Sequence, residues 1–386
     1  MLVSSALITA LQREAAMTLR FHWRLPQGGE RAGVSRGHQA ALAQTGLPDI
    51  EPQAEFCRAA EESGIDSLLT DFGWSKPDSI LLGAALGMMT SRIKFIIAYR
   101  SGLICPTSFV QQLNTLSALI GGRFSLNVVA GHSPEEQRYY GDFLPHDERY
   151  SRTEEFLEVC RRFWVGEGPV SFEGLYFRVE GGRLNTPFVS EERRFPELYI
   201  AGSSEAARKL ALSQGTCWMR LAEPPSKVAE SACDLIAAGK ELGIRCSVVA
   251  RPTREEAIEA AREIQSGADS KFNDRAGERG FVNHSDSISI NSSYRLAETE
   301  WLTPTLWTGL IRSHGGAAIA LVGSYDEIAE SLIEYGKAGV TQFILSGWPK
   351  LDEMRLFGRG VIPRVRRLER KSHAAVVAEP APALAK

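Results

Sequence analysis

Two hydroxyl side chains stand where an apolar run meets a helical pattern, in the stretch LYIAGSSEAARKLA at residues 198–211. A strand that ends in Gly202, Ser203 and Ser204 before a helix offers backbone N–H groups and two hydroxyls near the positive end of the helix dipole. This corner suits the phosphate group of a ligand. A serine here can also serve only as a helix cap, and that alternative stays open.

More polar groups follow an earlier apolar run, in NVVAGHSPEEQRYYGDFLPHDERY at residues 127–150. The stretch brings Asn127, His132 and Tyr150 to the same edge of a parallel sheet. An Asn amide can recognise the edge of a heterocycle, and a Tyr hydroxyl can donate to a phosphate. Together, the two stretches predict a planar, phosphorylated ligand.

Composition argues against several other partners. The net charge is −3, without a dense Lys/Arg stripe, so nucleic acid is not expected to bind. No apolar run reaches the roughly 18 to 20 residues of a membrane span. The six cysteines and seven histidines are scattered, without CxxC or HExxH spacing. We therefore expect no metal site, reduced thiols and a cytoplasmic location.

The elements that must position these residues alternate between short apolar runs and helical patterns. Strands are predicted at 19–25, 65–73, 92–102, 123–132, 197–204, 216–221, 245–252 and 340–349. Helices are predicted at 51–64, 77–91, 106–122, 150–166, 204–215, 225–243, 253–267 and 324–339. Near-continuous apolar strands, each followed by a helix, indicate a (β/α)₈ TIM barrel, with its site at the C-terminal mouth. The first strand-to-helix loop lacks GxGxxG, which disfavours a dinucleotide-binding fold.

Two stretches interrupt the repeat. Residues 168–185 alternate as an inserted β-hairpin does, and residues 267–305 are polar, long and weakly periodic. A loop of that length beside the mouth predicts a long mobile lid. We expect an N-terminal extension at 1–19, a single barrel domain at 20–370 and a flexible tail at 371–386.

With these motifs in place, the sequence resembles the bacterial-luciferase superfamily of flavin-dependent monooxygenases, and within it the alkanesulfonate monooxygenases. The resemblance is carried, in order along the chain, by FHWRLP, RIKFIIAYRSGLICPTSFVQQLNTLSALIGGRFSLNVVAG, DERYSRTEEF, LYIAGSSEAARKLA, AEPP, HGGAAIALVGSYDEIAESLIEYGKAGVTQFILSGWPKLDE and LFGRGVIP.

The resemblance implies reduced FMN as cofactor, delivered by a separate NAD(P)H:flavin reductase, and transfer of one oxygen atom from O₂ to a small-molecule substrate. It also implies a homodimer or homotetramer. By carry-over, Ser203, Ser204 and Tyr150 hold the FMN phosphate. His22 and Asn127, with the end of the NVVAGH strand, lie along the isoalloxazine ring.

Four positions differ from the alkanesulfonate enzymes. Lys76 stands in place of a cysteine after the second strand, and Arg245 is followed two residues later by Ser247 where that family has a histidine. Trp348 replaces a tyrosine after the last strand. His314, with Arg312 two residues earlier, replaces an arginine before the GG pair.

The altered set suggests roles at the mouth. Lys76, Arg245, Arg312 and His314 can supply positive charge, which is worth most where water is excluded. His314 is also a candidate proton donor near neutral pH, and Trp348 a candidate aromatic wall. Further aromatic surface is expected from Trp23, Phe72 and Trp218, and Cys105 is expected to be a small apolar liner.

The substrate and the reaction stay open at this stage. One alternative is an organosulfonate cleaved at the C–S bond. The other is a larger biosynthetic intermediate that is hydroxylated or receives oxygen in Baeyer–Villiger fashion. Two rival classes are a deazaflavin (F420)-dependent dehydrogenase of the same fold and a flavin-binding relative without catalysis.

Overall fold

The computed structural model describes residues 18–27, 47–267 and 285–378. The predicted N-terminal extension therefore lies almost entirely outside the described residues, and so does much of the predicted lid. No helix within the described ranges is both long and apolar enough to cross a membrane.

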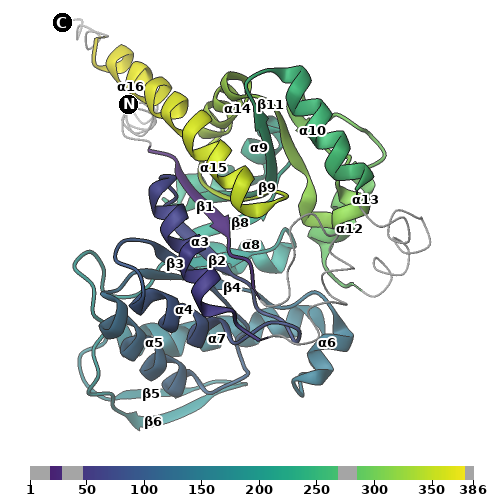
Figure 1. Ribbon diagram of the computed structural model, residues 1–386. Coiled ribbons are helices and arrows are strands. Elements are labelled where there is room, and N and C mark those ends of the chain that lie inside the picture. The colour runs from purple at the N-terminus through teal and green to yellow at the C-terminus, as the bar shows by residue number, and fades with distance from the viewer. Residues whose placement is uncertain (1–17, 28–46, 268–284, 379–386) are drawn as a thin grey trace, which may run out of the picture.

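Eight parallel strands close into a ring (Figure 1). In chain order, the ring strands are β1 (Arg20–Arg24), β2 (Ser67–Thr70), β3 (Lys94–Tyr99), β4 (Phe124–Val128), β7 (Leu198–Ala201), β8 (Cys217–Leu221), β9 (Glu241–Arg251) and β12 (Val340–Ser346). Each pairs in parallel with the next, and β12 pairs in parallel with β1 to complete the closure. The predicted (β/α)₈ barrel is confirmed.

Helices connect the strands and cover the outside of the ring. They are α3 (Ile50–Glu62), α4 (Ser79–Met88), α5 (Pro106–Ile120), α6 (Pro134–Tyr139), α7 (His146–Val165), α8 (Glu205–Ser213), α9 (Pro225–Ala237), α10 (Arg254–Ser266), α12 (Ile288–Leu296), α13 (Ile311–His314), η3 (Gly316–Ala318), α14 (Tyr325–Lys337), α15 (Lys350–Gly360) and α16 (Ile362–Ala378).

The strands are apolar along their whole length because both of their faces are covered. Alternate residues point into the lumen, where a cluster that includes Leu69, Ile96, Met219 and Ile344 fills the barrel. The intervening residues pack against the helices. Met219 extends over Gly243, where a Cβ atom would lie only 2.1 Å from its methyl carbon. The lumen is therefore a packed core between the two ends of the barrel.

The predicted hairpin is confirmed as the antiparallel pair β5 (Val170–Glu173) and β6 (Arg178–Gly182). The predicted loop at 267–305 is only partly described, and its described part is not a loop throughout. It contains the helix α12, capped by the Ser287 hydroxyl, which accepts from the amide of Ile290. Downstream, β11 (Ala320–Ser324) pairs in parallel with the C-terminal half of β9, and β10 (Leu306–Trp307) pairs with β11 in the antiparallel direction.

Two predicted boundaries differ from the ends of the helices in the structure. The helix predicted to continue to residue 243 ends at Ala237, because Gly239 takes a positive φ of 81° and Leu242 and Ile244 are buried strand residues. The tail predicted from residue 371 begins inside α16, which continues to Ala378. This helix lies beside the start of the barrel, where the amide of Leu19 donates to the Glu369 carboxylate at 2.7 Å.

Candidate functional site

The corner after β7 is built around a glycine. Gly202 has a φ of 128°, and a Cβ atom there would lie 2.8 Å from the Tyr150 hydroxyl oxygen and 3.0 Å from the Ala207 Cβ. Only glycine allows the backbone to come this close to the tyrosine. The Ser204 hydroxyl accepts from the amide of Ala207 at 3.1 Å, so the capping role is real and coexists with any binding role. We call Gly202, Ser203 and Ser204 the serine corner.

Tyr150 reaches the serine corner from α7. Its hydroxyl donates to the Ala201 carbonyl at 3.4 Å and also interacts with the Ser204 side chain. The ring is 9 % exposed, and burial raises the pKa of the phenol. The hydroxyl therefore stays protonated at neutral pH, and its hydrogen bond could turn from the Ala201 carbonyl to an anion.

Ser289, in the first turn of α12, also reaches this corner. The amide of Ser203 donates to the Ser289 hydroxyl at 3.0 Å, and the two hydroxyl oxygens lie 2.7 Å apart. Sequence reasoning missed Ser289, because a polar stretch with weak periodicity does not reveal which serine meets which strand end.

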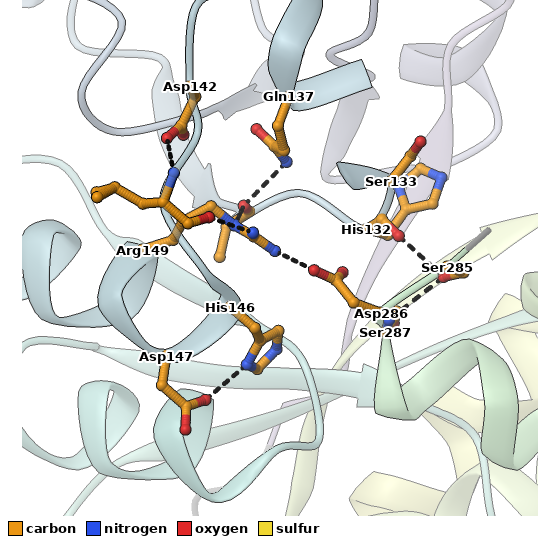
Figure 2. A network of polar contacts seen from close by, with 12 residues as sticks. His132, Ser133, Gln137, Asp142, His146, Asp147, Arg149, Ser285, Asp286 and Ser287 are labelled. Atoms are coloured by element: carbon orange, nitrogen blue, oxygen red, sulfur yellow. Dashed lines mark hydrogen bonds and ion pairs between the residues drawn. The ribbon is translucent and has the colours of Figure 1, made fainter. Parts of the chain in front are cut away.

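An ion pair and several hydrogen bonds hold the chain just before α12 against α7 and the loop after β4 (Figure 2). Arg149, 2 % exposed, donates from Nη2 to the Asp286 carboxylate at 2.6 Å and from Nε to the Ala130 carbonyl at 2.9 Å. The Asp286 amide and the Ser285 hydroxyl both donate to the His132 carbonyl, at 3.1 and 3.0 Å. The backbone carbonyl of His132 thus helps to hold the segment before α12.

Asn127 lies on β4 between Ala98 of β3 and Tyr199 of β7 in the sheet register. Its side chain is 8 % exposed, and its Oδ1 has no hydrogen-bond partner among the described residues. A buried amide oxygen without a partner is costly, so this acceptor is ready for a ligand N–H group.

A charged group gathers at the C-terminal ends of β1 and β2 and includes Arg245 from the middle of β9. Arg24 Nε lies 2.5 Å from the Asp71 carboxylate, and Lys76 donates to the Gln27 carbonyl at 3.5 Å. Burial alone would raise the pKa of Asp71, but the positive charges of Arg24, Arg245 and Lys76 hold it well below its usual range. The predicted Lys76 and Arg245 are therefore brought together around a carboxylate that the sequence analysis did not single out.

His314 and Trp348 are also brought together. Their ring centroids lie 4.4 Å apart, and the side chains are 3 % and 6 % exposed. Burial lowers the pKa of His314 to about 4, so the ring is neutral at pH 7 and supplies no positive charge, contrary to expectation. Its Nδ1 lies 2.8 Å from the Ser313 hydroxyl. Arg312 is half-buried on the same short helix.

Several polar atoms near this pair lack partners. They are His314 Nε2, Trp348 Nε1 and the hydroxyls of Ser247 and Ser346, none of which has a hydrogen-bond partner in the described ranges. Ser247 and Ser346 are register partners on β9 and β12. A ligand or a water molecule at this end of the barrel would satisfy these four buried polar atoms.

The structure does not bring His22 to the mouth. Its Nε2 lies 2.7 Å from Gln342 Oε1, and burial lowers the pKa of its ring to about 4. With Arg20, Lys94 and Glu197, it lines a cavity at the N-terminal ends of the strands. His22 lies too early in β1 to reach the mouth. Arg24, two residues later on the same face of the strand, does reach it.

Two other expectations fail. Trp23 occupies an outward position of β1 and packs against Phe357 of α15 with ring centroids 6.0 Å apart. Trp218 also points outward from β8, but its Nε1 donates to the Gly202 carbonyl at 2.7 Å, so it contacts the serine corner. Cys105 is exposed at the start of α5 instead of lining an apolar pocket. Phe72 does pack against the lumen cluster, as expected for a mouth residue.

Comparison with known proteins places the chain in a family. Residues 30–342 match the model of the luciferase-like monooxygenases, and the chain belongs to that family. The fold is also that of riboflavin lyase in complex with modified FMN and riboflavin, with a TM-score of 0.74, 20 % identity, and coverage of 91 % of this chain and 92 % of the other.

Two further solved structures share the barrel. EDTA monooxygenase from Chelativorans sp. BNC1 matches with a TM-score of 0.70 and 18 % identity, over 92 % of this chain and 98 % of the other. An F420-dependent secondary alcohol dehydrogenase matches with a TM-score of 0.61 and 19 % identity, over 91 % of this chain and all of the other. At these identities, the likeness concerns the fold.

Proposed function

We propose that this chain is the oxygenating component of a two-component monooxygenase that uses reduced FMN. The observation that carries the proposal is the convergence of the Tyr150 hydroxyl, Gly202 and the capping Ser204 at the N-terminus of α8. Gly202 lets the Tyr150 hydroxyl come close to the N-terminus of α8. Hydroxyl donors beside a helix N-terminus are suited to bind a phosphate monoester.

The residues present fit the FMN phosphate. The amide and hydroxyl of Ser203, the Ser204 hydroxyl and the protonated Tyr150 hydroxyl are donors, and α8 adds the favourable field of its dipole. Because Ser289 now holds Ser203, the phosphate would replace the contact between these two serines. The unsatisfied Oδ1 of Asn127 would accept from an N–H group of the isoalloxazine ring.

Bound reduced FMN would supply the electrons that activate O₂. The chain would supply the surroundings. Arg24, Lys76 and Arg245 place their positive charges around Asp71, and this positive field would help to stabilise an anion at the mouth. Trp348 would exclude water. His314, neutral at pH 7, would hold or accept a proton at Nε2, the ring atom without a partner among the described residues.

The type of oxidation depends on which substrate the enzyme takes. We propose an organosulfonate-like compound or a larger biosynthetic intermediate, oxidised by C–S cleavage, hydroxylation or Baeyer–Villiger insertion. A separate NAD(P)H:flavin reductase in the cytoplasm would provide the reduced flavin.

The second candidate is an F420-dependent dehydrogenase, because a dehydrogenase of that kind shares the fold. Such an enzyme would transfer hydride and consume no oxygen. A ligand that binds only the folded state raises the melting temperature. Reduced FMN should therefore stabilise this protein more than F420 does.

The decisive experiment supplies the purified protein with an NAD(P)H:flavin reductase, FMN and NADH, and follows oxygen uptake and product formation with candidate substrates. The proposal expects an oxygenated product that depends on both proteins. Stabilisation by F420 with hydride transfer under argon would support the dehydrogenase instead. Tight FMN binding without turnover of any substrate would indicate a flavin-binding relative that lacks catalysis.

A further inference from the structure

The contact between Ser203 and Ser289 keeps α12 on the serine corner. A backbone amide carries a single hydrogen, and the amide of Ser203 already donates to the Ser289 hydroxyl at 3.0 Å. A phosphate oxygen that accepts from the same amide must displace Ser289. A residue of the chain thus engages a donor that the phosphate needs, and whatever holds α12 in place determines how readily the phosphate can bind.

An ion pair holds the first turn of α12 in place (Figure 2). Asp286 lies three residues before Ser289, and its Oδ2 accepts from Arg149 Nη2 at 2.6 Å. The Asp286 amide also donates to the His132 carbonyl at 3.1 Å. Neither Arg149 nor Asp286 contacts Ser203 in the described hydrogen bonds and ion pairs, so the pair restrains the serine corner indirectly, through Ser289. We call the pair of Arg149 and Asp286 the latch.

The latch can open without isolating a buried charge. Arg149 also donates from Nε to the Ala130 carbonyl and from Nη1 to the Leu144 carbonyl, both at 2.9 Å, and these contacts do not involve α12. The Asp286 side chain is 24 % exposed, so its carboxylate can be hydrated when it leaves Arg149. Its Oδ1 has no hydrogen-bond partner in the described part of the chain, so a single hydrogen bond joins the two side chains.

Both charges of the latch also act on the serine corner. Tyr150 follows Arg149 in α7, and the charges of Arg149 and Asp286 shift the pKa of its phenol in opposite directions. A phosphate beside the Tyr150 hydroxyl would experience the same two charges, attracting Arg149 and repelling Asp286. These forces pull the two side chains of the latch apart, in the direction that also withdraws Ser289.

We infer that the latch holds Ser289 on Ser203 as an autoinhibitory contact, and that the FMN phosphate must release the first turn of α12 to bind. This inference rests on the proposed function, because it concerns the phosphate of the same cofactor. Since FMN would bind only when the latch is open, its apparent affinity is lower than its affinity for the open corner. The latch would thereby limit how tightly the chain retains a flavin that a separate reductase supplies.

The first test is hydrogen exchange of the peptide that contains residues 286–296, with FMN and with riboflavin, which lacks the phosphate. The variant is Arg149→Gln with Asp286→Asn, which removes the latch without leaving either charge unpaired. The matched control is Arg162→Gln with Glu158→Gln, which removes another ion pair of α7. Affinity for both flavins is measured on all three proteins by fluorescence quenching.

We expect saturating FMN to speed exchange in this peptide by about threefold or more in the unaltered protein and in the control, whereas riboflavin leaves it unchanged. In the latch variant, exchange at α12 should be fast without any ligand, while exchange in the barrel strands stays as in the unaltered protein. FMN should bind the latch variant about three- to tenfold more tightly, as the net contribution of one such contact implies, and riboflavin should bind both proteins equally.

A second variant tests the contact itself and leaves the latch intact. Ser203→Cys with Ser289→Cys places two thiols where the hydroxyl oxygens lie 2.7 Å apart, which is close enough for a disulfide to form. The oxidised form should bind FMN at least about tenfold more weakly than the reduced form, and a reducing agent should restore binding. Riboflavin should bind both forms equally.

Three results would overturn the inference. They are slower exchange at α12 when FMN binds, an FMN affinity of the latch variant no higher than that of the unaltered protein, and equal FMN affinity of the oxidised and reduced cysteine variant. If exchange at α12 is faster in the latch variant but FMN binds to no form of the protein, the latch stands as a restraint on α12 and the proposed function fails.

Discussion

The hydroxyls of Ser203 and Ser289 lie 2.7 Å apart although 86 residues separate them in the chain. The contact joins the end of β7 to the first turn of α12, and the amide of Ser203 also donates to Ser289. The amide and the hydroxyl that Ser203 would offer to a phosphate therefore both contact Ser289 of α12.

The first prediction follows from this contact. Replacing Ser289 by alanine should free the amide and hydroxyl of Ser203, so FMN should bind about two- to fivefold more tightly. Flavin fluorescence quenching measures the change, and another side-chain contact of α12, in which Arg295 Nη2 donates to the Ser292 hydroxyl, is left intact. Weaker binding would mean that Ser289 itself holds the phosphate.

The second prediction separates capping from anion binding at Ser204. Aspartate caps a helix about as well as serine does, so Ser204→Asp should keep the melting temperature of the protein. Its negative charge should weaken FMN binding by more than tenfold. Ser213→Ala, an exposed serine at the other end of α8, is the control and should change neither quantity.

The third prediction concerns Gly202. Alanine there would hold a positive φ and push a Cβ atom against the Tyr150 hydroxyl, so Gly202→Ala should lower the free energy of unfolding by about 1–3 kcal/mol. Adding Tyr150→Phe should recover part of that loss, because the nearest atom is then gone. Urea unfolding of the two variants would show no such recovery if the backbone strain alone matters.

The fourth prediction uses the two buried histidines. The folded state lowers the pKa of both His22 and His314 to about 4, from 6.5 for a free imidazole. Between these values the unfolded chain binds protons that the folded chain does not, so stability should fall as pH drops from about 6.5 to 4. His314→Gln and His22→Gln should each reduce that slope.

The same pair provides a control for function. Only His314 lies beside Trp348, whereas His22 lines the cavity at the opposite end of the barrel. Under the proposed function, His314→Gln should reduce product formation relative to oxygen uptake, and His22→Gln should leave that ratio unchanged. An equal loss in both variants would point to a general effect on stability.

The fifth prediction concerns Asp71. Its pKa is held below the usual range by Arg24, Arg245 and Lys76, so its stabilising effect should be present above about pH 4 and should be lost as pH falls through its lowered value. Asp71→Asn leaves three cations without their carboxylate and should cost about 3 kcal/mol at pH 7. Denaturation at pH 7 and at pH 3 should show a smaller difference from the unaltered protein at the lower pH.

The barrel could be predicted from the sequence because it depends on the periodicity of apolar residues and on the order of strands and helices along the chain. Apolar runs that alternate with helical patterns leave few arrangements of a parallel sheet. The serine corner and Lys76 were also within reach, since Gly202, Ser203 and Ser204 end one predicted strand and Lys76 closely follows another.

Other features depend on where a side chain points and on which distant residues it meets, and the sequence pattern gives neither. His22 and Arg24 lie on the same face of β1, and nothing local to the sequence tells which of the two reaches the mouth. Ser289 meets Ser203 only through the path of a segment that carries no clear periodicity.

The packed lumen limits the path by which ligands can enter and leave the protein. Met219 and its neighbours fill the lumen beneath the C-terminal mouth of the barrel. A ligand that enters at the mouth must therefore also leave there. Whichever molecule lies deepest must arrive first and depart last. Kinetics with two ligands should therefore follow a compulsory sequence imposed by the architecture.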